Sequence, residues 1–183
     1  MMRNVTLEQL YEHPVTQKYV KRSGLAHAIA ASYHAFHLAV KNNANPDLAV
    51  KAAFLHDMGH YTWYRNGEWD FDSYKENDIH SIKGAERAHK LLIRLGENPG
   101  HAKEIAVAVL LHTDSFLPVN HDQLQLSTLQ QIVALADELD EEPAGGHHYR
   151  SISESKARRD IKNLDQLIDQ SLQKSRAEET SEV

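Results

Sequence analysis

The sequence of 183 residues contains no cysteine, which excludes disulfide bonds and thiolate metal ligands. No apolar run approaches the length of a membrane span, and the first residues, MMRNVTLEQLYEHP, lack the apolar segment of a signal peptide. The formal net charge of -6 leaves no excess of basic residues, which argues against nucleic acid and anionic membranes as partners. We therefore expect a cytoplasmic protein without nucleic-acid or membrane partners.

The sequence also lacks internal repeats, low-complexity linkers and any convincing alternation of apolar and polar residues. Helical periodicity dominates instead, and we predict one all-α domain over residues 1–175, a helical bundle around a metal site, with a disordered tail at 176–183. Glycine and proline are sparse, and several of them fall where helices should begin or end. The pattern predicts about seven helices, at residues 14–23, 25–42, 45–59, 78–95, 99–112, 127–140 and 151–174.

Histidine is abundant, with 13 residues. The position of each histidine relative to the apolar residues indicates whether its side chain faces the interior or the solvent. Residues three, four and seven apart share one face of a helix. In the predicted helix at 45–59, His56 lies on the same apolar stripe as Ala49 and Ala53. Five predicted helices each direct one histidine or aspartate inward in this way: His27, His56, His80, His112 and Asp137.

Asp57 follows His56 directly in the segment FLHDMGH, at the end of an apolar helix. A buried carboxylate is costly unless a cation or strong hydrogen-bond donors meet it. Any one of the inward residues taken alone is typical of a satisfied core or cleft position, but five together indicate a metal site. Imidazole and carboxylate without thiolate suit Fe, Mn, Co, Ni or Zn, and a bridging carboxylate suits two metals.

Five segments occur in order over residues 20–142: LAHAIAA, LHDMGH, HSIKGAERA, VLLHTD and ALADELDE. Together they resemble the HD-domain superfamily of metal-dependent phosphohydrolases. The layout is similar to that of the small bacterial members that cleave diadenosine tetraphosphate, although Gly59-His60 stands where Gly-Lys is common. The spacing to the His-Asp pair favours His27 as the first ligand over His34, which lies seven residues later on the same helical face.

The resemblance implies a centre of two divalent metals, chosen from Fe, Mn, Co, Ni, Zn and Mg. Asp57 would bridge the metals and take part in catalysis. The other implied ligands are His27, His56 and Asp137 on one metal, and His80 and His112 on the other. The implied reaction is attack by metal-activated water on a phosphoester or phosphoanhydride of a nucleotide or a related small phosphorylated molecule. An HD-type diiron oxygenase would use the same ligands, and a non-enzymatic nucleotide-binding module is a further alternative.

A phosphorylated substrate also needs cations beyond the metals. Lys83 lies three residues after His80 and is a candidate for both substrate binding and catalysis. Arg150 follows the predicted loop at 143–148 and is a second candidate for substrate binding. His60 follows a glycine in a predicted loop, where it could either compete as a metal ligand or hydrogen-bond the substrate.

Overall fold

The computed structural model describes residues 3–61, 64–66, 68–114 and 123–181. Within these residues the chain is predominantly helical, which confirms the predicted all-α class. The α-helices are α1 (Leu7–Glu12), α2 (Pro14–Lys41), α3 (Pro46–Leu55), α4 (Phe71–Glu76), α5 (His80–Leu95), α6 (Pro99–Leu110), α7 (Thr128–Glu138) and α8 (Glu154–Ser181). The short antiparallel strands β1 (Tyr64–Arg65) and β2 (Glu68–Trp69) form a hairpin, and η2 (Pro143–Tyr149) is a 3-10 segment.

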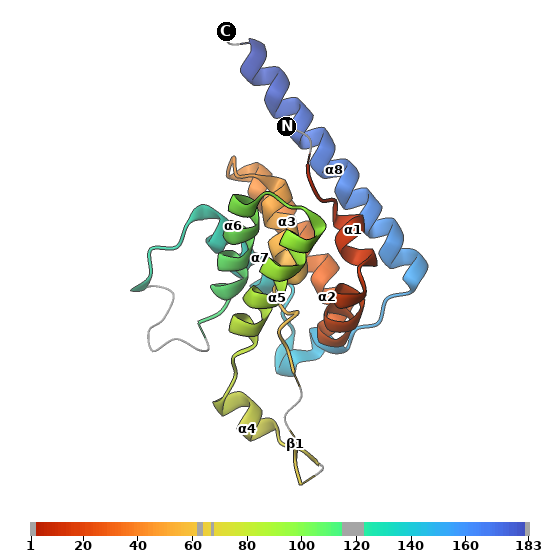
Figure 1. Cartoon of the computed structure of the whole chain (residues 1–183), viewed down its shortest axis with the longest axis vertical. Coiled ribbons are helices and arrows are strands. Elements are labelled where there is room, and N and C mark those ends of the chain that lie inside the picture. The colour runs from red at the N-terminus through yellow and green to blue at the C-terminus, as the bar shows by residue number, and fades with distance from the viewer. Residues whose placement is uncertain (1–2, 62–63, 67, 115–122, 182–183) are drawn as a thin grey trace.

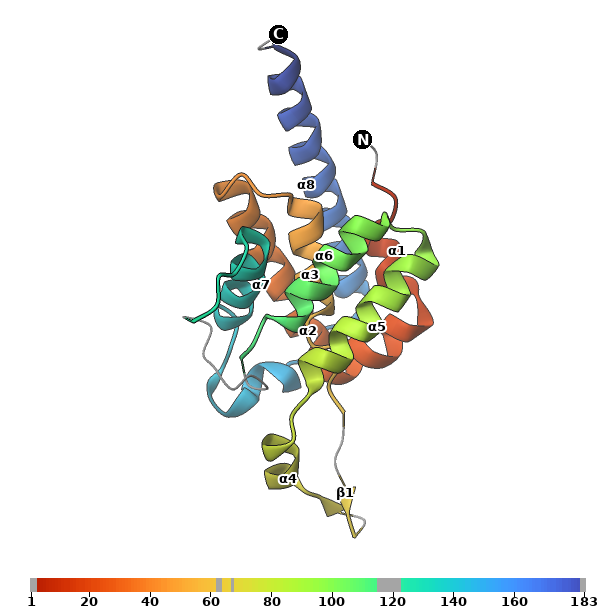
Figure 2. The ribbon, with the colours of Figure 1, turned by 60° about the vertical axis from the view of Figure 1, so that its left-hand side comes forward.

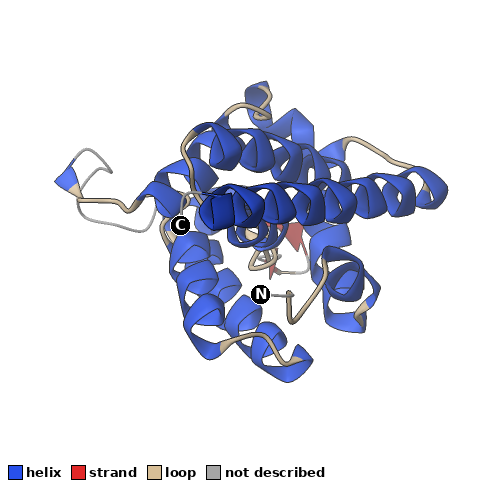
Figure 3. Cartoon of the chain, turned by 90° about the horizontal axis from the view of Figure 1, so that it is seen from above, coloured by secondary structure: helices blue, strands red, loops and turns tan. Residues whose placement is uncertain are grey.

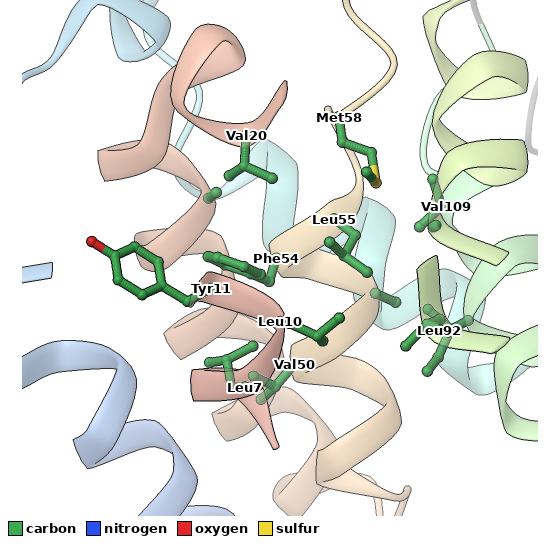
Figure 4. Close-up of a cluster of buried hydrophobic side chains, with 14 of the residues drawn as sticks. Leu7, Leu10, Tyr11, Val20, Val50, Phe54, Leu55, Met58, Leu92 and Val109 are labelled. Atoms are coloured by element: carbon green, nitrogen blue, oxygen red, sulfur yellow. The ribbon is translucent and has the colours of Figure 1, made fainter. Parts of the chain in front are cut away.

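Helix α3 lies at the centre of the bundle. All ten of its residues are buried, and it contacts α2, α6, α7 and α8. Figure 4 shows its side chains Val50, Phe54 and Leu55 among apolar side chains from α1, α2, α5 and α6. The start of α3 follows from the sequence, because the Asn45 side chain accepts hydrogen bonds from the first backbone N–H groups. The His-Asp pair at the end of this helix is therefore delivered to the interior.

An alanine-rich seam joins α2, α3 and α7. Its members are alanines one helical turn apart on each helix, together with Ile132, and the small alanine side chains let the helix axes approach closely. The seam consists of Ala31, Ala35, Ala39, Ala49, Ala53, Ile132 and Ala136. His27 lies one turn before Ala31, His56 lies one turn after Ala53, and Asp137 follows Ala136. The close packing of three helices therefore ends where these three side chains meet.

Helices α5 and α6 form an antiparallel pair, packed side by side (Figure 2). Gly96 ends α5 in the left-handed conformation, with φ 88°, and Asn98 caps the start of α6. Because the connection is short, the first residue of α5 and the residues just after α6 lie at the same end of the pair. This arrangement places His80 opposite His112.

The two ends of the molecule carry extensions in opposite directions (Figure 1). One is α8, which packs on the body through Ala157, Ile161, Leu164 and Ile168 and then continues past it. Seen from above, α8 crosses over the other helices (Figure 3). The other extension contains the hairpin and α4. In the described part of the chain, no helix combines the length and apolar character needed to cross a membrane.

Several predicted boundaries are corrected by the structure. The break expected at Gly24, between 14–23 and 25–42, is confirmed: φ 118° and ψ 83° at this residue are non-helical, and they kink the chain between two helical segments that together carry the label α2. The expected loop at 59–77 contains the hairpin and α4, and the expected loop at 143–148 is η2. Helix α1 was not predicted, and α8 continues through Ser181, beyond the expected end at residue 174. The single-domain division and the disordered tail at 176–183 stay predictions.

Candidate metal centre

Four side chains form a first group of converging donor atoms. Nε2 of His27 lies 3.0 Å from Oδ1 of Asp137 and 3.2 Å from Nε2 of His56. Nε2 of His56 lies 3.2 Å from the same Asp137 oxygen and 3.3 Å from Oδ2 of Asp57. Both imidazoles are fully buried. His34 belongs to none of these contacts, and His27 is the histidine of α2 that lies in this group.

A second group forms on the other oxygen of Asp57. Nε2 of His80 and Nε2 of His112 lie 3.1 Å apart. Oδ1 of Asp57 lies 3.7 Å from the first of these nitrogens and 3.6 Å from the second. The ring of His60 joins the group, since its Nε2 lies 3.1 Å from the same oxygen. The Asp57 carboxylate thus lies between two groups of imidazole Nε2 atoms.

Two glycines allow the His-Asp turn to lie directly against α5. A Cβ atom on Gly59 would lie 1.7 Å from the carbonyl oxygen of His80, which no side chain could tolerate. A Cβ atom on Gly84 would lie 3.0 Å from the carbonyl oxygen of His56. The distance between Asp57 and His80 therefore depends on backbone contact that only small residues permit.

Each imidazole that turns Nε2 inward has its Nδ1 bonded on the outer side. The Nδ1–H groups of His56 and His112 donate to the carbonyl oxygens of Ala53 and Val109, at 2.6 and 2.7 Å. Nδ1 of His27 and Nδ1 of His80 pair with carboxylates, those of Asp140 and Asp78, each at 2.7 Å. Outer partners of this kind fix the orientation and tautomer of metal-binding histidines.

These bonds decide what the centre can hold. A neutral imidazole carries a single N–H. Here the hydrogen-bond acceptors on the outer side favour the tautomer with that proton on Nδ1. The inward Nε2 atoms then present lone pairs to one another at 3.1 and 3.2 Å, an arrangement that repels unless a cation or an added proton lies between them. Nitrogen and carboxylate oxygen together are a donor set for divalent transition metals. The residues present therefore fit a metal pair.

The pKa values of the buried groups also depend on the charges that face one another in the centre. Burial by itself would lower the pKa of His56, but the carboxylates of Asp57 and Asp137 outweigh burial and hold that pKa well above its usual range. Burial by itself would raise the pKa of Asp57, yet the adjacent imidazoles, His56 foremost, hold it well below its usual range. At His80, burial and the neighbouring His60 and His112 lower the pKa. The first group thus favours ionised carboxylates beside a cation, whereas His80 in the second group favours the neutral imidazole, the form that binds a metal.

A cleft of about 660 Å³ opens onto both donor groups. Its floor includes Asp57, His60, His80, His112 and Asp137. Its remaining lining comes from the residue after α6, the end of α7, the connection that follows α7, and η2, and these residues form the rim: Thr113, Glu138, Glu141, Glu142, Pro143, Gly145, His147 and His148. No lysine or arginine is among the described residues that line this cleft.

Comparison with known proteins identifies the family of the chain. Residues 24–142, more than half of the chain, match the HD domain family. The chain belongs to the HD domain family. It is 66% identical over 169 residues to "Putative phosphohydrolase YueE" of Bacillus subtilis (strain 168), covering 92% of this chain and 95% of that protein. Its fold is similar to the crystal structure of a "predicted HD superfamily hydrolase" from an uncultured Thermotogales bacterium, with a TM-score of 0.50 and 19% identity over 90% of this chain and 88% of that one.

The predicted ligands of the HD domain are brought together, whereas two predicted substrate cations are not. Lys83 stands over the ring of Tyr61, with Nζ 4.1 Å from the ring centroid. Arg150 pairs with Asp140 and with Glu142. Neither cation is among the described residues lining the cleft, while His60 is.

The residues that bond to the outer nitrogen atoms of these histidines were not predicted from the sequence. Asp140 lies three residues after Asp137, and this spacing on one helical face was a usable signal. Asp78 precedes His80 by two residues and both accepts from its Nδ1 and caps its backbone N–H. Tyr74 of α4, which bonds to Nδ1 of His60, gave no sequence signal at all.

Proposed function

We propose that this chain is a metal-dependent phosphohydrolase that cleaves a phosphoester or phosphoanhydride bond of a small phosphorylated molecule. The observation that carries the proposal is the position of Asp57. Its Oδ2 lies 3.3 Å from Nε2 of His56, and its Oδ1 lies 3.6 Å from Nε2 of His112. One carboxylate between two imidazole clusters is typical of sites for two metals. Membership of the HD family and the phosphohydrolase name of the relative from Bacillus subtilis support the reaction class.

The proposed ligands divide between two metals. The first metal would be held by His27, His56, Asp57 and Asp137, and the second by Asp57, His80 and His112. When bound, two divalent cations lower the pKa of a water molecule and neutralise charge on phosphoryl oxygens. The nitrogen-rich donor set favours Fe, Mn, Co, Ni or Zn over Mg, which prefers oxygen ligands.

The protein itself orients the donor atoms and supplies the negative charge near the metals. The acceptors on the outer side keep each Nδ1 protonated and each Nε2 available, so the donor atoms are oriented in advance. Burial of His27, His56 and Asp57 keeps bulk water away from these donors. The Asp57 carboxylate contributes negative charge to both groups. Its replacement would therefore affect both metals.

The cleft indicates what kind of substrate it accepts. Its volume of about 660 Å³ is within the range of small-molecule sites. The carboxylates of Glu138, Glu141 and Glu142 at the rim would repel a phosphate but accept hydrogen bonds from hydroxyl and amino groups. We propose that the phosphate lies at the metals and that a nucleoside or a similar hydroxylated part lies at the rim. The roles of Lys83 and Arg150 in substrate binding stay predictions.

A substrate panel tests the function. The purified chain, loaded separately with Mn²⁺, Co²⁺, Fe²⁺ and Mg²⁺, is incubated with nucleoside phosphates, dinucleoside polyphosphates and sugar phosphates. We expect release of phosphate or of a shorter phosphorylated product with at least one transition metal and one hydroxylated substrate. Asp57→Ala, prepared in parallel, should release none and serves as the control for contaminating phosphatases.

The same material separates hydrolysis from oxygenase chemistry. Chain loaded with Fe²⁺ under anaerobic conditions is exposed to oxygen in the presence of organophosphonates and polyols. We expect no substrate-dependent oxygen uptake. Oxygen uptake with these compounds, combined with no hydrolysis of any phosphorylated substrate, would replace the proposed function with a diiron oxygenase.

A further inference from the structure

His60 occupies a position in the metal centre that the six proposed ligands do not account for. Its Nε2 lies 3.1 Å from Oδ1 of Asp57, the oxygen that faces the second donor group. Its ring lies parallel to that of His80, with the centroids 4.2 Å apart and an angle of 6° between the planes. Asp57, His60 and His80 offer donor atoms that all lie within 4.8 Å of one another.

The second donor group needs another ligand more than the first group does. The first group brings four side chains together: His27, His56, Asp57 and Asp137. Among the described residues, the second group without His60 has three: Asp57, His80 and His112. Addition of His60 gives both groups the same number of protein donors.

The outer side of His60 follows the same rule as the other imidazoles. Nδ1 of His60 hydrogen-bonds to the hydroxyl of Tyr74, just as Nδ1 of His80 bonds to Asp78. A phenol oxygen can accept the Nδ1–H, which leaves the Nε2 lone pair directed at the centre. Tyr74 belongs to α4, so this hydrogen bond ties α4 to the second donor group.

We propose that His60 is a ligand of the second metal, held in place by Tyr74, rather than a residue that contacts only the substrate. This inference rests on the proposed two-metal function. A residue that contacts only substrate would leave metal affinity unchanged when removed. A ligand and its outer partner would both change that affinity without any substrate present.

The test is a titration of the metal-free full-length chain with Co²⁺, followed by calorimetry and by visible absorption of the bound cobalt. His60→Ala should keep the first binding event and weaken the second by about 100-fold or more, since even outer-shell losses cost about 10- to 100-fold. Tyr74→Phe, which removes only a hydroxyl, should weaken the second event by about 10-fold. His89→Ala, an exposed histidine on α5, should match the unmodified chain. Circular dichroism of the metal-free variants checks that each is folded.

The outcomes separate the two proposals. Two binding events in the unmodified chain, with the second weakened in His60→Ala and Tyr74→Phe, support the inference. Two events of unchanged affinity in both variants overturn the role of His60 and leave the proposed function standing. A single event in the unmodified chain overturns the two-metal function and the inference with it.

Discussion

His80 and His112, 32 residues apart in the chain, face each other through Nε2 atoms only 3.1 Å apart. Each ring already has its Nδ1 bonded to an acceptor, Asp78 for the first and the carbonyl of Val109 for the second. Neither ring has a second proton to place between the two nitrogens while it stays neutral. A cation shared by the pair would resolve this contact, which is why we propose a second metal here.

Removal of either histidine should therefore remove one metal and leave the other. His80→Ala and His112→Ala are expected to bind one equivalent of Mn²⁺ per chain, at the group formed by His27, His56, Asp57 and Asp137. Metal content after gel filtration is the measurement. His101→Ala, on α6 and outside the cleft, is the control and should bind as the unmodified chain does. Unchanged metal content in both test variants would contradict the assignment.

Asp140 should matter for the first metal although it does not lie among the converging donor atoms. Its Oδ2 accepts from Nδ1 of His27 at 2.7 Å and also pairs with Arg150. Asp140→Asn weakens this acceptor, and we expect the affinity for the first metal to fall by about 10- to 100-fold. Glu138→Gln removes the same charge from the same region without touching the ring, so it should change the affinity little. Equal effects of the two substitutions would show that only net charge matters.

Substitution of Gly59 should be destabilising because any side chain would clash with α5. An added Cβ would lie 1.7 Å from the carbonyl oxygen of His80, so α5 would have to move away from the His-Asp turn. We expect Gly59→Ala to lower the free energy of unfolding by about 3 kcal/mol and to weaken the second metal. Gly96→Ala has open space around its Cβ but a positive φ, and should cost about 1 kcal/mol with normal metal binding. Urea denaturation and metal titration of both variants provide the comparison.

Much of the fold, and the convergence of the candidate ligands, could be predicted from the sequence because both depend on helical periodicity. The apolar stripe through Ala49 and Ala53 points His56 inward, and the helix pair joined at Gly96 aligns His80 with His112. Helix α4 could not be predicted from the same signal, because its six residues are too few to show a period. At Gly24, a residue typical of a helix end, the backbone does leave the helical conformation and kinks α2, where the sequence predicted a break.

The cations illustrate what helical spacing does not reveal. Lys83 lies one turn from His80, yet its side chain turns to the ring of Tyr61. Arg150 lies close to the centre in space, yet it is paired with Asp140. Position on a helix fixes where a long side chain begins, whereas the partners available around it fix where its charge lies.

The central claim is that Asp57 joins two metals, and metal content per chain tests it most directly. The metal-free chain and its Asp57→Ala variant are saturated with Mn²⁺, passed through gel filtration and analysed for metal. Asp169→Ala serves as the control, since Asp169 pairs with Arg3 and does not line the cleft. We predict two metals in the unmodified chain and in the control, and none in Asp57→Ala, with the helical circular dichroism signal retained in all three. Saturation of the unmodified chain at one metal, or full metal content in Asp57→Ala, would contradict the account.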